Sequence, residues 1–194
     1  MSRVPTAGLI LAAGLGTRFG GRKLLAPIGG RPMLQHVLDL AADARLRPVV
    51  VVLGNDANEL ETACTWRDEL RVHNPTPENG LSGSVALGFA TLSRLGAQRV
   101  AVLMGDQPFL DPDHFRAILI ARGQIVVPRY DGKPGNPVVL DHSVFPLARS
   151  LHGDRGFSQL FAAYANLVTY VNLPGTNPDI DTPDDLLGRN AATR

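Results

Sequence analysis

The chain has 194 residues, of which 44% are hydrophobic and 19% charged, a balance that predicts one globular domain, residues 1–194, with a full core. A net charge of +1 argues against a nucleic-acid partner, and the single cysteine, Cys64, excludes an internal disulfide and a cysteine metal cage. No apolar run approaches the roughly 20 residues that span a bilayer, and no signal peptide is evident, so we expect a cytoplasmic protein with no membrane partner.

The first predicted element is a buried strand over Ala7–Ala13, which leads into a glycine-rich loop running from Gly14 to about Arg31. We assign no secondary structure to this loop. Its glycines would let a phosphate approach backbone N–H groups, and it carries two cations, Arg18 and Lys23. The chain has only two lysines among 19 basic residues, so a lysine here indicates a need for a compact ammonium on a triphosphate. The alternative is a flexible surface turn with incidental charge.

Two common phosphate-binding loops do not fit this sequence. In a Walker loop a lysine follows the second glycine directly, whereas Gly16 and Gly21 are followed by Arg22. The dinucleotide pattern would need glycine at position 19, which is Phe19, and no acidic residue ends the second predicted strand. The sequence therefore favours neither a P-loop hydrolase nor a dehydrogenase.

Strands and helices alternate along the rest of the chain. Further strands are predicted at Val49–Leu53, Leu70–His73, Val100–Met104 and Gln124–Val127. Helical patterns lie at roughly Met33–Ala44, Ala57–Arg67, Ser84–Leu95 and Pro112–Ala121. This alternation predicts an α/β fold, a three-layer, Rossmann-like, doubly wound and mostly parallel sheet, whose ligands bind beyond the carboxyl ends of its strands. Glycine and proline interrupt the pattern over Arg129–Leu140, which we expect to be a small extended excursion carrying an acceptor or oligomer contact.

The segment Asn74–Ser84 joins a predicted strand to a predicted helix. Ser82 or Ser84 would cap that helix, and a capped turn is the plainer interpretation. The N-terminus of the helix would also lie on the ligand side of the sheet, where it is suited to bind phosphate or the edge of a base.

Asp106 stands at the carboxyl end of the strand Val100–Met104, on the side where the glycine-rich loop is expected. A carboxylate near a triphosphate would repel it unless a divalent cation stood between them, so this position favours a magnesium ligand. An aspartate that only caps a turn is the alternative.

A second carboxylate comes from a distant segment near Asp181. Residues 182–185 predict a helix start, with threonine as the N-cap followed by proline, and this leaves Asp181 unexplained. Asp179 and Asp181 would point the same way around a buried Ile180. Because a phosphate-bridging Mg²⁺ uses few protein ligands, two such carboxylates would suffice, and the capping pattern favours Asp181 over Asp179.

The glycine-rich loop resembles the nucleotidyltransferase signature L-A-A-G-x-S-x-R-M-G-x-x-K, in the form found in molybdenum cofactor cytidylyltransferases and related molybdopterin nucleotidyltransferases. The match runs in order through Leu11, Ala12, Ala13, Gly14, Arg18, Gly20 and Lys23. Gly16 replaces the usual serine and Phe19 the usual methionine. The resemblance implies a fold of the nucleotide-diphospho-sugar transferase type and a single nucleotidyltransferase domain.

Three further elements of that family are matched on the nucleotide and metal side. Asp106 stands in the family's Asp-Gln-Pro context, and Asp181 matches the metal-ligand position of its D-[IV]-[DN]-T-P-x-D-L element. The stretch N-P-x-W-x-x-G-x-x-x-S-L is matched at Asn74, Gly80 and Ser84, but its aromatic residue is replaced. The resemblance thus implies a nucleotide site formed by Leu11, Ala12, Ala13, Gly14, Gly16, Thr17, Arg18, Lys23, Asn74, Gly80, Ser84 and Asp106.

Two elements on the acceptor side, of the forms G-x-x-G-N-P and G-D-x-G, imply contacts from Lys133, Asn136 and Arg155 to a phosphorylated pterin. Glycine and proline alone also predict turns here, and that alternative stays open.

The resemblance implies transfer of CMP from CTP to the phosphate of molybdopterin, with release of pyrophosphate. Catalysis would fall to Arg18, Lys23, Asp106 and Asp181, the two aspartates holding Mg²⁺, with Mn²⁺ as an alternative. A molybdenum hydroxylase is a candidate partner. The alternatives are guanylyl transfer to molybdopterin, transfer to a sugar phosphate or to methylerythritol phosphate, and a non-catalytic chaperone that delivers the cofactor.

Overall fold

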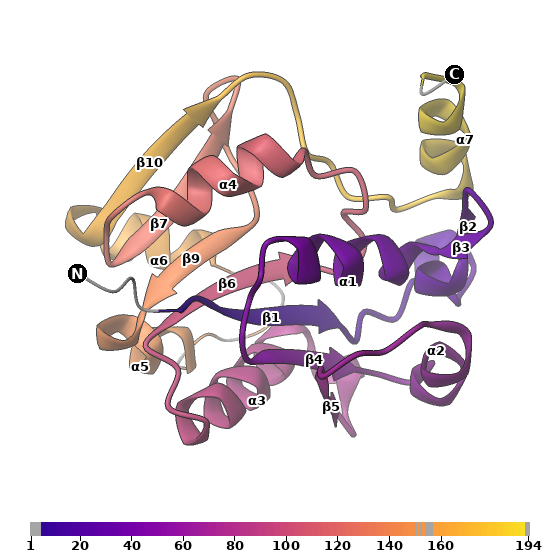
Figure 1. The fold of residues 1–194 in the computed structure, drawn as a ribbon, viewed down its shortest axis with the longest axis horizontal. Helices are drawn as coiled ribbons and strands as arrows, with labels where there is room; N and C mark the ends of the chain where they lie inside the picture. Colours follow the sequence, from indigo (N-terminus) through magenta and orange to yellow (C-terminus); the bar gives the residue numbers. More distant parts are fainter. Residues whose placement is uncertain (1–4, 150, 152, 154–156, 193–194) are drawn as a thin grey trace.

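A computed structural model of the protein describes residues 5–149, 151, 153 and 157–192. Its main strands are β1 (Ala7–Ala12), β4 (Val49–Leu53), β5 (Leu70–His73), β6 (Arg99–Met104), β7 (Ile125–Tyr130), β8 (Lys133–Pro134), β9 (Val138–Asp141) and β10 (Val168–Leu173). Within the described residues they form one sheet in the order β10-β7-β9-β6-β1-β4-β5, with β8 paired to β7 (Figure 1). Neighbouring strands are parallel except that β9 is antiparallel to both β6 and β7, and β8 to β7.

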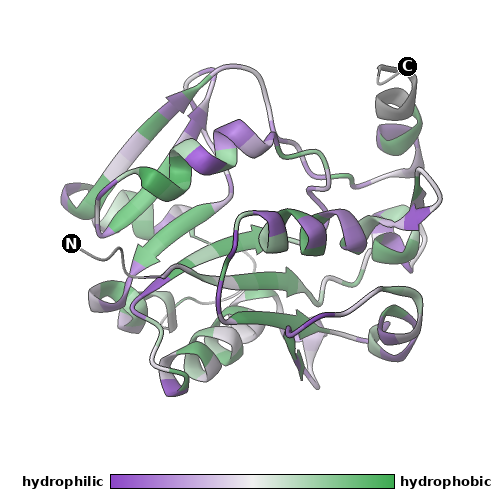
Figure 2. Ribbon diagram, viewed as in Figure 1, coloured by the Kyte–Doolittle hydropathy of each residue, from purple (hydrophilic) through white to green (hydrophobic). Residues whose placement is uncertain are grey.

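Helices cover both faces of this sheet. They are α1 (Met33–Asp43), α2 (Ala57–Ala63), α3 (Leu81–Arg94), α4 (Pro112–Ile120), α5 (Phe145–Arg149), α6 (Ser158–Ala163) and α7 (Pro183–Ala192). Side chains alternate along the strands, so that Ile10 packs with α1, α2 and α4 whereas Leu9 packs with α3, α5 and α6. Figure 2 shows the hydrophobic central strands and the polar outer faces of the helices. The predicted three-layer, mostly parallel α/β fold is confirmed.

The glycine-rich loop is more regular than the sequence indicates. It contains two 3₁₀ turns, η1 (Thr17–Phe19) and η2 (Lys23–Leu25), and a small hairpin of β2 (Pro27–Ile28) and β3 (Arg31–Pro32). Short turns of this kind have no hydrophobic periodicity, so a pattern search does not find them. The structure thus supplies the turns and the hairpin that the sequence left unassigned.

The extended excursion is narrower than predicted. Arg129 and Tyr130 complete β7, and Val138 to Leu140 are fully buried in β9, in the middle of the sheet. The excursion is therefore only the turn between β7 and β9 that contains β8. Asp131 and Gly132 both have positive φ angles there and reverse the chain. An acceptor or oligomer contact on β9 itself is excluded by its burial.

Four other elements differ from the sequence expectation. Helix α3 begins at Leu81 after Gly80 and has no side-chain cap, so neither Ser82 nor Ser84 caps it. The sequence pattern also missed α5, α6 and β10, which are short or half-exposed elements. None of the described helices is long and apolar enough to cross a membrane.

Candidate active site

The carboxyl ends of β1, β4 and β6 face one edge of the sheet, and the chain that leads into α7 passes the same edge (Figure 1). The loops at this edge enclose a cavity of about 360 Å³. Its lining comes from the loop after β1, from the segment between β5 and α3, from the end of β6, and from residues just before α7. This is the ligand edge expected for a doubly wound sheet.

The glycine-rich loop owes its shape to residues in the left-handed region. Gly16, Gly20 and Gly21 have φ angles of 59°, 90° and 88°. The N–H groups of Phe19 and Gly21 donate to the Gly16 carbonyl at 3.0 Å each, which closes the first turn. At Gly16 a side chain would be strained, and its Cβ would lie 3.1 Å from Lys23 Cβ. The usual serine of the related signature would therefore be strained at Gly16, and the turn packs directly against Lys23.

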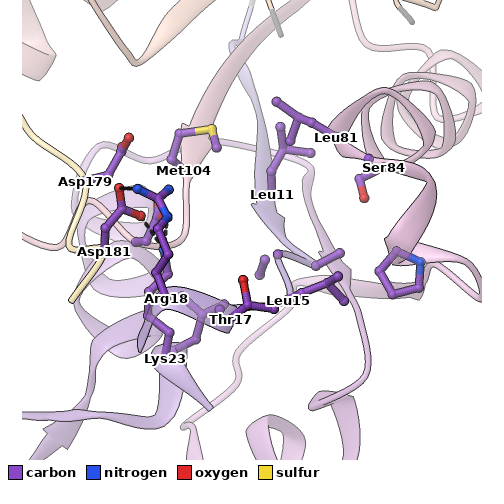
Figure 3. A pocket seen from close by; sticks show the side chains of 18 of the residues that line it. Leu11, Leu15, Thr17, Arg18, Lys23, Leu81, Ser84, Met104, Asp179 and Asp181 are labelled. Carbon is purple, nitrogen blue, oxygen red and sulfur yellow. Dashed lines mark hydrogen bonds and ion pairs between the residues drawn. The ribbon is translucent and has the colours of Figure 1, made fainter. Parts of the chain in front are cut away.

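Lys23 bridges two carboxylates at the cavity. Its Nζ lies 2.6 Å from Asp106 Oδ2 and 3.3 Å from Asp181 Oδ1, and its side chain is only 10% exposed. Arg18 reaches Asp181 from the solvent side, with Nη1 2.9 Å from Oδ2 and a side chain that is 73% exposed (Figure 3). The four charged residues named from the sequence thus form one ion-pair cluster, in which Lys23 and Asp181 alone are 158 positions apart in the chain.

Asp106 is held against β1 by the backbone of its own loop. The N–H of Gly105 donates to the Leu11 carbonyl at 2.9 Å, and a Cβ at Gly105 would lie 3.1 Å from that oxygen. One carboxylate oxygen of Asp106 pairs with Lys23, while the other, Oδ1, is buried and has no hydrogen-bond partner among the described residues. A buried oxygen without a partner is costly, and a cation ligated at the cavity would satisfy it.

Asp181 ends a short segment, residues 177–181, which we call the strap. The N–H of Ile180 donates to the Asp106 carbonyl at 3.0 Å, and its side chain is 1% exposed in the core. On the other side, Asp185 Oδ2 accepts the N–H groups of Asp181 and Thr182 at 3.0 and 2.8 Å, as in a capping box. Hydrogen bonds therefore hold the backbone on both sides of Asp181, at Ile180 before it and at Thr182 after it.

Asp179 is a third carboxylate at this site, and it lines the cavity beside Asp181 (Figure 3). Burial raises the pKa of Asp179, and the nearby negative charges of Asp106 and Asp181 raise it further. A hydrogen bond from Gln107 and the charge of Lys23 oppose this shift without cancelling it. The sequence pattern correctly indicated that Asp179 and Asp181 face the same way around Ile180.

The remaining predicted nucleotide residues fall into two groups. The backbone from Leu11 to Arg18, together with Gly80 and Ser84, lines the cavity. Asn74 is not part of the lining; it is buried, and its Nδ2 donates to Ser84 Oγ at 3.0 Å. Asn74 thus holds Ser84 in the first turn of α3.

Sequence reasoning did not identify several of the residues that line the cavity. They are Leu15, Leu24, Pro77, Glu78, Leu81 and Met104. Pro77 stands where the related motif has an aromatic residue, so its place in the motif could have indicated that it lines the nucleotide site. The apolar residues carry no chemical signal that separates them from core residues.

Two of the three predicted acceptor residues, Lys133 and Asn136, lie outside this lining. Lys133 is exposed on β8, and the Asn136 carbonyl accepts hydrogen bonds from Tyr130 Oη at 3.0 Å and Asn177 Nδ2 at 3.1 Å. Burial raises the pKa of Tyr130 to about 12, so its hydroxyl stays a donor at neutral pH. Arg155 lies outside the described residues.

No group of three or more His, Cys, Asp or Glu side chains in the described part of the chain has the arrangement of a metal site. Three carboxylates, those of Asp106, Asp179 and Asp181, line the cavity, and Asp106 Oδ1 is the oxygen among them that is buried without a hydrogen-bond partner in the described part of the chain. This donor set fits a hard divalent ion that takes few protein ligands and completes its shell with water and phosphate oxygens.

The chain resembles several known proteins of related architecture. Purine catabolism protein PucB of Bacillus subtilis is 30% identical over 189 residues, which are 92% of each chain. Bifunctional protein GlmU of Bordetella petrii is 39% identical over 119 residues, which are 60% of this chain but 26% of GlmU. The chain thus spans about a quarter of the length of the GlmU relatives that it matches.

Solved structures of Rv0371c from Mycobacterium tuberculosis superpose on nearly the whole chain. One gives a TM-score of 0.86 at 27% identity and covers 98% of this chain and 100% of the other. A second, in complex with manganese, gives a TM-score of 0.82 with the same identity and coverage.

The model of the MobA-like NTP transferase domain matches residues 8–167, which include the glycine-rich loop and Asp106. The fold, the loop at the carboxyl end of β1 and the carboxylates opposite it agree with that match. The chain therefore belongs to the MobA-like NTP transferase family.

Proposed function

We propose that this nucleotidyltransferase transfers CMP from CTP to the phosphate of molybdopterin and releases pyrophosphate. The observation that carries the transfer chemistry is the cluster of Lys23 and Arg18 with Asp106 and Asp181 at one cavity. Two cations on a glycine-rich loop suit the β- and γ-phosphates, and the carboxylates opposite them suit a divalent ion. The cavity of about 360 Å³ has the volume of a small-molecule site.

The chain's own residues would act mainly by holding charge in place. On nucleotide binding, Lys23 and Arg18 would turn from the carboxylates to the phosphate oxygens and neutralise the charge that develops on the leaving pyrophosphate. An acceptor phosphate is already ionised at neutral pH, so its attack on the α-phosphate needs no general base. Backbone N–H groups of the loop and Ser84 would orient the nucleotide for in-line transfer.

Asp106 and Asp181 are the residues that we propose as ligands of a divalent metal, most simply Mg²⁺. The partnerless Oδ1 of Asp106 supports this assignment, as does the manganese complex of Rv0371c. When bound there, the metal would supply charge neutralisation at the reacting phosphates. The metal would then compete with Lys23 and Arg18 for the Asp181 carboxylate, because both cations pair with it in this structure.

The choice of CTP and of molybdopterin rests on the sequence resemblance. Ala12-Ala13 follows the cytidylyl branch, whereas the guanylyl branch more often has Ala-Gly-Gly. Lys133 and Asn136, on the turn around β8, are proposed acceptor contacts, and Arg155 is a third. The single buried cysteine, Cys64, is consistent with work in the reducing cytosol.

A transfer assay with each of the four triphosphates tests this proposal. Pyrophosphate release is measured with Mg²⁺ and with molybdopterin, a sugar phosphate or methylerythritol phosphate as the acceptor. We expect release with CTP and molybdopterin, and much less with every other pair. Turnover with another pair would reassign the substrates, and binding without any turnover would favour the cofactor-delivery role.

A further inference from the structure

A buried glutamine joins the strap to the end of β6. Gln107 is 7% exposed, and its Nε2 donates to the Asn177 carbonyl at 3.0 Å and to Asp179 Oδ1 at 2.8 Å. Its Oε1 accepts from Asn177 Nδ2 at 3.1 Å. Both amide protons and the amide oxygen are therefore used in bonds to the strap, which is how buried polar groups avoid the penalty of lost hydration. We call these three bonds the amide clamp.

The amide clamp lies between the two proposed metal ligands. Gln107 follows Asp106 in sequence, and the residues that it grips precede Asp181 by two and four positions. The hydrogen bond from the Ile180 N–H to the Asp106 carbonyl adds a backbone contact between the strap and the same loop after β6. Any shift of the strap along β6 would therefore change the spacing between the Asp106 and Asp181 carboxylates.

The clamp also works against electrostatic repulsion. Asp106, Asp179 and Asp181 are three acidic side chains near one cavity, and like charges in a partly buried site push apart. Lys23 offsets this repulsion in the ligand-free protein. Once Lys23 turns to a triphosphate, the strap loses one of its attractions to Asp106, and the clamp is what remains together with the backbone bond from Ile180.

We propose that Gln107 is a positioning residue, whose side-chain amide fixes the strap so that Asp181 faces Asp106 at the spacing needed to bind a divalent metal. This inference rests on the proposed function of the two aspartates. Gln107 does not itself line the cavity, so its effect is transmitted through Asn177 and Asp179. Groups that orient metal ligands typically change metal affinity by about 10- to 100-fold when they are removed.

The test compares Gln107→Met with Gln35→Met, a matched control. Gln35 is 5% exposed and its amide also makes three hydrogen bonds, to Asp39 Oδ1, the Thr65 carbonyl and the Thr65 N–H. Its bonds go to Asp39 and Thr65 and to no residue of the strap, so its loss removes similar bonds without touching the proposed metal ligands. Both variants should lower the urea midpoint of unfolding by similar amounts.

Binding of Mn²⁺ alone, followed by the electron paramagnetic resonance signal of the free ion, is the main measurement. We expect Gln107→Met to weaken Mn²⁺ binding about tenfold and Gln35→Met to change it less than twofold. In metal-free buffer, CTP affinity should be unchanged in both. In steady-state assays the half-saturating metal concentration should rise about tenfold for Gln107→Met, while kcat at saturating metal changes far less.

A second variant keeps the test decisive if Gln107→Met fails to fold. Asn177→Ala breaks the clamp from the strap side, and the double variant should weaken Mn²⁺ binding by less than the product of the single effects, because both break one unit. If Gln107→Met and Asn177→Ala both bind Mn²⁺ like the wild type, Gln107 is only a structural residue and the inference is wrong. If Asp181→Asn also leaves Mn²⁺ binding unchanged, the metal site of the proposed function is wrong as well.

Discussion

At the scale of single residues, the site is a set of ion pairs that must exchange partners. Lys23 and Arg18 form ion pairs with Asp106 and Asp181 in this structure. Sequence reasoning predicted all four as site residues: Arg18 and Lys23 in the glycine-rich loop, Asp106 at a strand end, and Asp181 just before a predicted helix start. It could not foresee that the lysine lies between the carboxylates, since that contact joins positions 83 and 158 residues apart in the chain.

The first prediction concerns the two carboxylates. Asp106→Asn and Asp181→Asn should each lower the transfer rate at least about a hundredfold, because each removes charge from the proposed metal site at the reacting phosphates. Asp113→Asn is the control, since that side chain is 82% exposed and pairs only with Arg116 among the described residues. Rates are measured at limiting Mg²⁺, and near wild-type turnover for either site variant would remove that residue from the metal site.

The second prediction separates Lys23 from its neighbour. Lys23→Arg should lower the rate on the order of a hundredfold although it keeps the charge, because a planar guanidinium has a different reach from the nearly buried ammonium and would displace the phosphates. Lys23→Ala should cost at least as much. Arg22→Lys should matter little, since Arg22 is exposed and pairs with Glu59 at 3.3 Å. Equal, mild effects in all three would show that Lys23 does not act on the triphosphate.

The third prediction concerns Cys64, at the end of α2. Burial raises the pKa of this thiol to about 11, so the fraction of thiolate at pH 8 is about a hundredfold below that of a free cysteine of pKa 9.0. Alkylation by iodoacetamide should therefore be slow in the folded protein and should rise with pH up to a midpoint near 11. Unfolding in urea should restore the ordinary rate. Rapid labelling of native protein at pH 8 would contradict the burial of this side chain.

At the scale of secondary structure elements, prediction from sequence worked where apolar runs are long and fully buried. The four valines and the leucine of β4 are almost completely buried between both helix layers, and such a run has one interpretation. By contrast, β10 is half-exposed at the sheet edge, and β9 is a four-residue strand within a segment rich in glycine and proline. In both cases tertiary pairing, which no local pattern reports, decides the structure.

The fourth prediction tests the packing of α3 on β1. A Cβ at Gly88 would lie 2.3 Å from Leu9 Cδ1, so the helix and strand are close enough to require glycine. Gly88→Ala should lower the free energy of unfolding by about 1–3 kcal/mol through overpacking. Gly83→Ala, at an exposed position of the same helix where the nearest atom is 3.7 Å away, should instead raise it by about 0.5–1 kcal/mol.

Urea unfolding of the two variants decides the point. If both substitutions stabilise the protein to the same degree, helix propensity alone governs α3, and the close contact between Gly88 and Leu9 does not exist in solution.

At the scale of the whole molecule, the site joins both halves of the sheet. The glycine-rich loop follows β1, Asp106 follows β6, and the strap arrives from β10 at the far edge of the sheet. A ligand that contacts all three should stabilise the fold as a unit, because it binds the native state and not the unfolded chain.

The fifth prediction follows from this linkage. CTP with Mg²⁺ at about 100 times its dissociation constant should add about 2.7 kcal/mol, which for a chain of this size raises the melting temperature by about 5–11 °C. Asp181→Asn should lose the part of this shift that depends on metal and keep the part seen in EDTA. Thermal melts followed by circular dichroism measure both parts. An equal shift with and without metal would place the nucleotide away from the carboxylates.

The wide spacing of the site along the chain also bears on how the protein is made. A ribosome releases the chain from its N-terminus, so the loop of Lys23 and the end of β6 emerge well before Asp181, which is 158 positions after Lys23. In the partial chain, Lys23 can already pair with Asp106, and this long-range contact would hold the loop to β6 while β9 and β10 are still to be added. Arrival of the strap then completes the cavity, so only a chain that extends through Asp181 carries the proposed site.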